Sequence, residues 1–254
     1  MDEHIVLGSK LSLIRSSRAS VVPYLCKNIN GKDVLYFLFG IDKVSLEITD
    51  FGGGVKKEEF SLQAALREFK EESDIIFGDL YNNPNDFINE IAIHSNDMSV
   101  LFIPLSNDWY VKAVPEFKNR KNDNMKSKKR SHCEMERIFW MDETSLLKLL
   151  NNSQNCSTHS LYSQNNNSLS SSLPSSNNYS SNNTLNSSLN SSLNIRYFSS
   201  SNGYYSNNNL QSTKNNRMWS RLHRFYKKYI TNDFLEILRI KYRIENYFFL
   251  KTKK

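Results

Sequence analysis

Between residues 151 and 213 the composition changes abruptly, and this change limits which parts of the chain can build a core. The stretch consists largely of Asn and Ser with scattered Leu and Tyr, and Arg196 is its single charged residue. No helical or strand period is sustained, and a segment this polar cannot bury enough apolar surface to offset its ordering entropy. We expect a disordered insertion at 151–213, which leaves a folded domain at 1–150 and a shorter C-terminal segment at 214–254.

Positive charge is concentrated in two parts of the chain. The net charge is +7, yet residues 214–254 alone hold twelve Lys and Arg against three acids. A second basic cluster occupies residues 118–130. Such patches attract polyanions such as RNA, although a basic surface that only keeps a protein solvated is at least as common. Within the second cluster, the candidate substrate-binding residues are Lys128, Lys129 and Arg130.

The sequence gives no indication of a membrane or secretory context. Residues 1–4 lack a basic flank ahead of an apolar core, and no run of about 18 apolar residues occurs. The cysteines are odd in number and form no CxxC pair, so neither a disulfide framework nor a zinc site is predicted; they are Cys26, Cys133 and Cys156. We expect an intracellular, cytoplasmic protein in a reducing compartment, without a membrane partner.

Several segments have the composition of strands. Residues 18–27 and 33–40 are rich in β-branched and aromatic side chains, and they flank Asn30-Gly31, a strong hairpin signal. Residues 44–50 alternate enough to suggest another strand, which would lead into a run of glycines. Residues 89–105 predict two further strands joined by a turn of polar residues. The N-terminal domain therefore contains a sheet.

The most informative helix is expected at residues 61–73, with Ser61 as its N-cap. Apolar residues recur there at three- and four-residue steps, so one face of this helix docks on a core. Elsewhere on the helix, Glu68 lies near Glu71 at i,i+3 and Glu72 at i,i+4. Like charges at these spacings destabilise a bare helix by roughly 0.2–0.5 kcal/mol per pair. A divalent cation bound through oxygens would compensate, whereas the ordinary alternative is a solvated acidic face.

The remaining regular patterns lie on either side of the Asn/Ser-rich stretch. Residues 134–141 predict a strand, and residues 142–150 predict a capped helix. Residues 217–230 form a helical pattern with an aromatic face, and a second helix is expected to begin after Thr231-Asn232. Aromatics at helical spacing usually pack, so these basic amphipathic helices are expected to complete or extend the core.

The acidic helix belongs to a longer pattern, Gly53-x5-Glu59-x7-Arg67-Glu68-Phe69-x-Glu71-Glu72-x-Asp74-Ile75. This pattern resembles the Nudix box of the Nudix hydrolase superfamily, Gly-x5-Glu-x7-Arg-Glu-(apolar)-x-Glu-Glu-x-Gly-(apolar). The charged positions, the first glycine and both apolar positions match without a gap. Asp74 replaces the last glycine, and Phe51 stands where the family usually has a proline before Gly52 and Gly53. The resemblance covers a small part of the chain.

The resemblance implies an α/β fold, an α/β/α sandwich around a mixed sheet. It also implies metal-dependent hydrolysis of a phosphoanhydride bond in a nucleoside diphosphate linked to another moiety. By this resemblance Glu68, Glu71 and Glu72 bind Mg²⁺ or Mn²⁺, and the Gly53 carbonyl contacts the metal as well. Arg67 would orient a neighbouring carboxylate, either Glu68 or Glu59 of the motif.

The general base and the substrate remain open. Glu68 is one candidate base, and Glu134 or Glu136 is another, because either could supply an extra carboxylate just before a final strand. The basic clusters suit a long polyanion, so the 5′ cap of an mRNA is one substrate hypothesis. Dinucleoside polyphosphates, nucleotide sugars, nucleoside triphosphates and inositol pyrophosphates are others. A different class of function is a Nudix-fold module that has lost catalysis and binds RNA or protein.

Overall fold

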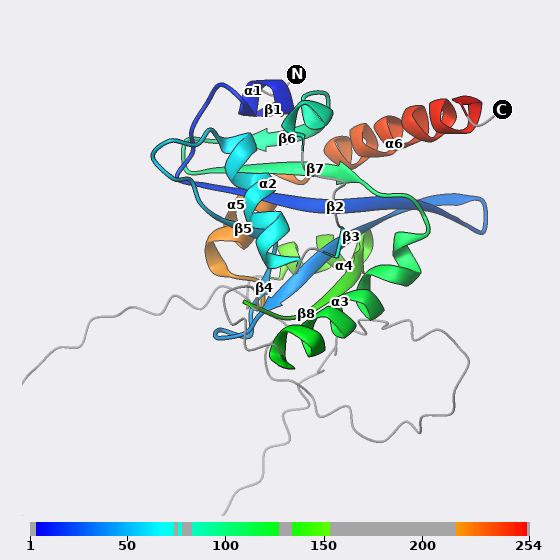
Figure 1. Cartoon of the computed structure of the whole chain (residues 1–254). Helices are drawn as coiled ribbons and strands as arrows, with labels where there is room; N and C mark the ends of the chain where they lie inside the picture. Colours follow the sequence, from blue (N-terminus) through cyan, green and yellow to red (C-terminus); the bar gives the residue numbers. More distant parts are fainter. Residues whose placement is uncertain (1–3, 74–75, 78–82, 127–133, 153–216, 253–254) are drawn as a thin grey trace, which may run out of the picture.

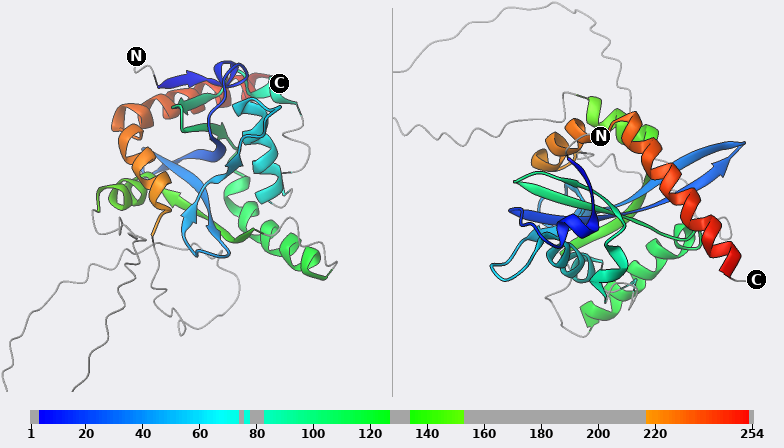
Figure 2. Two further views of the ribbon diagram at one scale, coloured as in Figure 1. Left: turned by 90° about the vertical axis from the view of Figure 1, so that its left-hand side faces the viewer. Right: turned by 90° about the horizontal axis from the view of Figure 1, so that it is seen from above.

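The computed structural model describes residues 4–73, 76–77, 83–126, 134–152 and 217–252. These residues form one mixed sheet with helices packed on both of its faces (Figures 1 and 2). The expected α/β/α sandwich around a mixed sheet is therefore confirmed. Residues 153–213 of the expected insertion lie outside the described residues, as do Asp74 and the three basic residues Lys128, Lys129 and Arg130.

The sheet has eight strands: β1 (Ile5–Leu7), β2 (Arg18–Ile29), β3 (Lys32–Asp42), β4 (Ile48–Thr49), β5 (Phe51–Gly54), β6 (Ile91–His94), β7 (Met98–Pro104) and β8 (Met135–Asp142). Their order is β1-β6-β7-β2-β3-β4, with β5 paired to β2 and β8 paired to β3. The β2–β7 pair is parallel and the other pairs are antiparallel. Strands β2 and β3 form the middle of the sheet, because each pairs with three neighbours.

The hairpin between β2 and β3 follows the sequence signal. Ile29 pairs with Lys32, which leaves a two-residue turn at Asn30-Gly31. Both turn residues adopt positive φ angles, 54° at Asn30 and 81° at Gly31. Asn and Gly tolerate this conformation better than other residues, and turns with two positive φ angles match the twist of the flanking strands.

The strand expected at residues 44–50 is wrong over most of its length, since β4 contains only two residues. The side chain of Asp42 accepts hydrogen bonds from the backbone N–H groups of Val44 and Ser45, at 3.0 and 2.6 Å. Leu46 then adopts a φ of 57°. Asp side chains commonly close such turns by bonding the backbone that follows. This local turn competes successfully with strand formation.

The helices are α1 (Gly8–Leu11), α2 (Ser61–Glu72), the 3₁₀ helix η2 (Pro84–Phe87), α3 (Trp109–Lys126), α4 (Glu143–Asn151), α5 (Ser220–Tyr229) and α6 (Asn232–Thr252). Ser61 is not the N-cap of α2, because Phe60 occupies that position and Gln63 accepts its N–H at 3.1 Å. Ser61 is buried and bonds the Ser16 N–H instead, at 3.0 Å. None of the described helices is long and apolar enough to cross a bilayer.

Two apolar clusters separate the faces of the sheet. Along β2, Ala19 and Val21 belong to the cluster that includes α2 and α3, whereas Val22 and Tyr24 belong to the cluster that includes α4, α5 and α6. Successive side chains of a strand point to opposite faces, so one strand supplies both cores. Figure 2 shows α2 and α3 on one side of the sheet and α4 with α5 on the other.

The C-terminal helices α5 and α6 contribute side chains to the core. Leu222, Tyr226, Phe234 and Leu238 are each 0% exposed. Each large apolar side chain that is fully buried contributes about 1.5–3 kcal/mol. Together these four contributions are comparable with the net stability of a whole domain, about 5–15 kcal/mol. Residues 1–150 therefore depend on a segment that lies beyond the Asn/Ser-rich stretch.

Candidate active site

The candidate site lies where β5 leads into α2, and two glycines allow the close packing there. A Cβ atom at Gly52 would lie 2.1 Å from Ser20 Cβ and 2.6 Å from the Ala19 carbonyl oxygen. A Cβ atom at Gly53 would lie 2.4 Å from Cδ of the Glu68 carboxylate. Gly52 is therefore packed against the backbone of β2, and Gly53 makes the space that the Glu68 side chain occupies.

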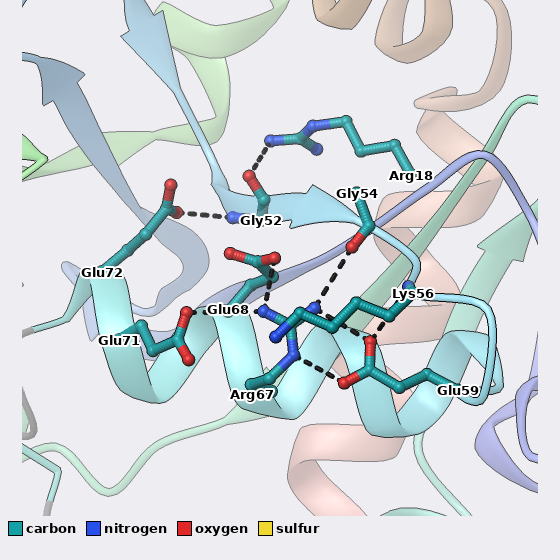
Figure 3. A network of polar contacts seen from close by, with 9 residues as sticks. All are labelled: Arg18, Gly52, Gly54, Lys56, Glu59, Arg67, Glu68, Glu71 and Glu72. Atoms are coloured by element: carbon teal, nitrogen blue, oxygen red, sulfur yellow. Dashed lines mark hydrogen bonds and ion pairs between the residues drawn. The ribbon is translucent and has the colours of Figure 1, made fainter. Parts of the chain in front are cut away.

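Arg67 is the centre of the polar network in Figure 3. Its Nε and Nη2 donate to the two carboxylate oxygens of Glu59, at 2.6 and 2.9 Å. Its Nη1 donates to Glu68 at 2.6 Å and to Glu71 at 3.4 Å. Nη2 also donates to the Gly54 carbonyl, at 3.1 Å. One guanidinium thus joins the glycine strand, the connecting loop and α2.

The charges of this network stabilise one another. Hydrogen bonds from Arg67 lower the pKa of Glu59, and the bond to Glu59 is the main reason that the pKa of Arg67 is raised. The paired atoms of Glu59 and Arg67 form a bidentate contact, in which the planar fork of an arginine matches the geometry of a carboxylate. Glu59 stays ionised and holds Arg67 in a fixed orientation toward Glu68.

Glu72 lies at the end of α2 in a different environment from Glu71. The Gly52 N–H donates to Glu72 at 2.6 Å, and burial raises the pKa of this carboxyl well above its usual range. The Glu71 side chain is 44% exposed, compared with 15% for Glu68. The three glutamates therefore differ in access to solvent, although the helix places them on one side of the site.

The carboxylate oxygens of Glu68, Glu71 and Glu72 are ligand atoms of the kind that a hard divalent cation binds. Within the described residues, Glu68, Glu71 and Glu72 each use only one carboxylate oxygen as a hydrogen-bond acceptor. The second oxygen of each remains available, and carboxylate oxygens are the ligands that Mg²⁺ prefers. No three acidic, His or Cys side chains of the described part of the chain already converge on a metal-sized position. Binding of a metal ion by these residues would therefore require side-chain rotation, and Glu71, as the most exposed of the three, has the most freedom to rotate.

A buried polar network behind the glycine strand was not predicted from the sequence. Arg18 Nη2 donates to Asp50 at 2.6 Å and to the Gly52 carbonyl at 2.8 Å. Asp50 also accepts hydrogen bonds from Ser20 at 2.7 Å and from the Tyr226 hydroxyl at 2.8 Å. Asp50 is completely buried. Since Tyr226 belongs to α5, this network ties a C-terminal helix to the glycine strand.

Gly52 connects this buried network to the carboxylates of α2. Its carbonyl oxygen accepts from Arg18, and its N–H donates to Glu72. The Arg18 guanidinium that bonds the Gly52 carbonyl also lies 5.2 Å from the ring centroid of Trp219. Contacts of a cation with an aromatic face are favourable when water is excluded. The position of the Glu72 carboxylate therefore depends on residues packed on the opposite face of the sheet.

The other two acidic residues predicted for the site lie on β8 or next to it. Glu136 accepts a hydrogen bond from Lys121 of α3 at 2.9 Å. Glu134 is exposed, and its carbonyl accepts the Lys43 N–H at 2.9 Å. Within the described residues, neither side chain bonds a residue of α2. A role for either as general base stays a prediction.

Many basic side chains of the C-terminal segment form ion pairs with acidic residues of the same protein. Five of them form ion pairs with acids of other elements: Arg217 with Glu47, Arg221 with Asp97, Arg239 with Glu143, Lys241 with Glu90 and Arg243 with Asp33. A paired cation attracts a polyanion less strongly than an unpaired one, because its field is already neutralised nearby. Part of the positive charge of this segment is thus neutralised by acids of the domain.

Substituting the two glycines by Ala should have different effects, on turnover at Gly53 and on stability at Gly52. Gly53→Ala should displace the Glu68 carboxylate, the mobile end of a side chain, and so lower turnover by about tenfold or more with little loss of stability. Gly52→Ala should lower the free energy of unfolding by at least about 1–3 kcal/mol, because the added Cβ would clash with the backbone of β2. Urea denaturation and turnover of both variants check this. Equal destabilisation of the two would contradict it.

No family model matches the sequence, and no curated protein matches it. A mutT/nudix family protein from Listeria innocua is 18% identical over 53% of this chain and 83% of its own chain, with a TM-score of 0.29. A C. elegans Ap4A hydrolase, solved as a binary complex, is 23% identical over 34% of this chain and 62% of its own chain, with a TM-score of 0.21. Similarity this weak supports no conclusion about chemistry, so function has to be inferred from the site residues.

Proposed function

We propose that the protein is a Nudix-type, metal-dependent hydrolase that cleaves a phosphoanhydride bond in a nucleoside diphosphate linked to another moiety. The observation that carries this proposal is the position of Arg67, which bonds Glu59, Glu68 and Glu71 beside Gly53. Residues that are only spaced in the sequence like a Nudix box would not have to converge in space. Here they form one network at a loop–helix junction.

In this proposal Glu68, Glu71, Glu72 and the Gly53 carbonyl hold Mg²⁺ or Mn²⁺. When bound, such a cation neutralises phosphate charge and lowers the pKa of a bound water. Arg67 keeps Glu68 oriented toward Gly53, and Glu59 keeps Arg67 in place. The absence of a side chain at Gly53 lets the Glu68 carboxylate lie directly against the glycine strand. The chain therefore supplies orientation and negative ligands, which is the larger part of catalysis in phosphoryl transfer.

We assign the role of proton acceptor to Glu68. One of its oxygens is held by Arg67, while the other accepts no hydrogen bond from the described residues. General bases typically contribute about 10²–10⁴-fold, so Glu68→Gln should lower kcat by a factor in this range, measured at saturating Mn²⁺. Glu136→Gln should leave kcat within about twofold, because it removes one exposed pair with Lys121. A larger loss in the Glu136 or the Glu134→Gln variant would move the base to that residue.

The substrate class is to be established by a panel. Phosphate or nucleotide release should be followed with capped RNA, dinucleoside polyphosphates, nucleotide sugars, nucleoside triphosphates and inositol pyrophosphates, each with Mg²⁺, with Mn²⁺ and with EDTA. We expect release that depends on the metal. The absence of turnover on every compound, with RNA still bound, would instead identify a binding module. For the mRNA cap, affinity should fall steeply with added salt, because phosphate contacts release counterions.

A further inference from the structure

A separate group of cations lines a cleft on the α5 face of the sheet. The cleft has a volume of about 640 Å³, within the range of about 300–1,000 Å³ that is usual for small-molecule sites. One wall is the outer face of α5, with Arg224, Lys228 and Tyr229. The other wall is the β6–β7 turn together with His4. None of these residues belongs to the network around Arg67.

The charge of this cleft is only partly neutralised. Arg221 is engaged, because it donates to the Asp97 carbonyl at 3.0 Å and lies 3.9 Å from the Asp97 carboxylate. Arg224 and Lys228 are one helical turn apart and exposed, and neither forms an ion pair with a described residue. Two like charges at i,i+4 destabilise a helix slightly unless an anion is shared between them. The pair is thus suited to a ligand of negative charge.

Aromatic and imidazole rings also line the cleft, and one of them contacts Lys228. Lys228 Nζ lies 4.8 Å from the ring centroid of Tyr229, and the His4 ring packs on the same Tyr229 ring at a centroid distance of 4.8 Å. His4 Nδ1 donates to the His94 carbonyl at 3.2 Å. Burial lowers the pKa of His94, so this ring is a neutral hydrogen-bonding group. The cations of α5 therefore provide the positive charge of the cleft.

The cleft opens at the same end of the sheet as the glycine strand. Gly54 pairs with Arg18, and Arg18 pairs with Met98, which lines the cleft. Two strand spacings separate Gly54 from Met98, a distance of about 10 Å. The Arg18 N–H also bonds the Asp97 carbonyl at 3.2 Å, which fixes the β6–β7 turn beside the start of β2. The two sites thus lie at the same end of the sheet on opposite faces, and a substrate shared by both would have to pass around this end.

We propose that the cleft between α5 and the β6–β7 turn binds phosphate groups of a polyphosphorylated small molecule, through Arg224 and Lys228. The role of the cleft in substrate binding rests on the hydrolase function proposed above. In that role the cleft would hold phosphate groups in the part of the substrate that is not cleaved. The ligand is a short polyphosphate or a compound with several phosphates, because the cleft is small and its free cations lie one turn apart. Contacts of charged groups with phosphate are strong and directional.

The binding test uses inorganic tripolyphosphate as the probe, by calorimetry in EDTA at low salt, so that no metal contributes. Lys228→Gln and Arg224→Gln should each weaken binding by about tenfold. Lys227→Gln is the matched control, since Lys227 is exposed on the same helix but does not line the cleft. It should change affinity by less than about twofold. Equal weakening by all three variants, or no binding by the wild type, would overturn the proposal.

The kinetic test separates the cleft from the hydrolase. On a polyphosphorylated substrate with Mg²⁺, Lys228→Gln should raise KM about tenfold and leave kcat unchanged, because the contact persists from ground state to transition state. An unchanged KM would overturn the substrate role of the cleft while leaving the hydrolase intact. If no substrate is turned over, the hydrolase fails, and tripolyphosphate binding that depends on Lys228 but not on Lys227 would still support the site.

Discussion

Replacing Glu71 by Gln should reduce kcat by more than about a hundredfold and leave the fold unchanged. Residues that only support metal ligands contribute about 10–100-fold, so a ligand itself should contribute more. The substitution keeps the size of the side chain, and Glu71 is 44% exposed with a single long contact to Arg67. Neither burial nor a strong ion pair is lost. Turnover with Mn²⁺ and thermal unfolding of the same preparation measure the two effects.

Glu58→Gln is the control for this loss of charge. Glu58 is an exposed glutamate in the loop before α2, next to Glu59 but outside the network. This variant should keep full activity. A metal titration followed by Mn²⁺ relaxation should show weaker binding only in the Glu71 variant. Retained activity of Glu71→Gln at saturating metal would show that the carboxylates of α2 do not form the catalytic site.

Removing the Asp50 carboxylate should destabilise the protein by about 3–5 kcal/mol, the usual effect of breaking a buried ion pair. In Asp50→Ala the guanidinium of Arg18 would stay buried with the Gly52 carbonyl as its hydrogen-bond acceptor. The hydroxyls of Tyr226 and Ser20 would also lose their acceptor. Because Arg18 and Gly52 fix the glycine strand, turnover should decrease together with stability.

Urea denaturation of Asp50→Ala against Asp33→Ala measures this effect. Asp33 also pairs with an arginine, but this partner, Arg243, is 55% exposed. Removing the Asp33 carboxylate should therefore change the free energy of unfolding by less than about 1 kcal/mol. Tyr226→Phe removes one hydrogen bond of the buried network and should lie between the two, at about 1–2 kcal/mol. If Asp50→Ala is no less stable than Asp33→Ala, the buried network does not hold the site together.

Local signals predicted the elements that carry the site. The Asn30-Gly31 turn fixes its hairpin because few other residue pairs adopt two positive φ angles. The apolar period of residues 61–73 determines which side of α2 is buried, and this leaves the glutamates at the surface of the core. The resemblance implied that Arg67 orients either Glu59 or Glu68, and Arg67 bonds both carboxylates. Short-range chemistry is therefore readable from one sequence.

Features that depend on distant residues or on competing local bonds were missed. Helix α3 contains Pro115, whose missing N–H normally argues against a helix interior, and a polar run weakens its apolar period. The partners of Asp50 are 32 and 176 residues away along the chain, at Arg18 and Tyr226. In the sequence, Tyr226 is only one of several aromatics on a helix. No periodicity reveals that its hydroxyl reaches a buried carboxylate.

The contribution of α5 and α6 to the core has a consequence for biosynthesis. The ribosome delivers β1 to α4 first, then the long Asn/Ser-rich stretch, and only afterwards the helices that cover the second face of the sheet. Closing a loop of this length adds little to the equilibrium free energy, but contacts between distant residues slow folding. Until α5 emerges, Asp50 lacks the Tyr226 hydroxyl and one apolar face stays open to water. The nascent chain should therefore need shielding from aggregation during synthesis of that stretch, and should gain its function only after α5 has docked.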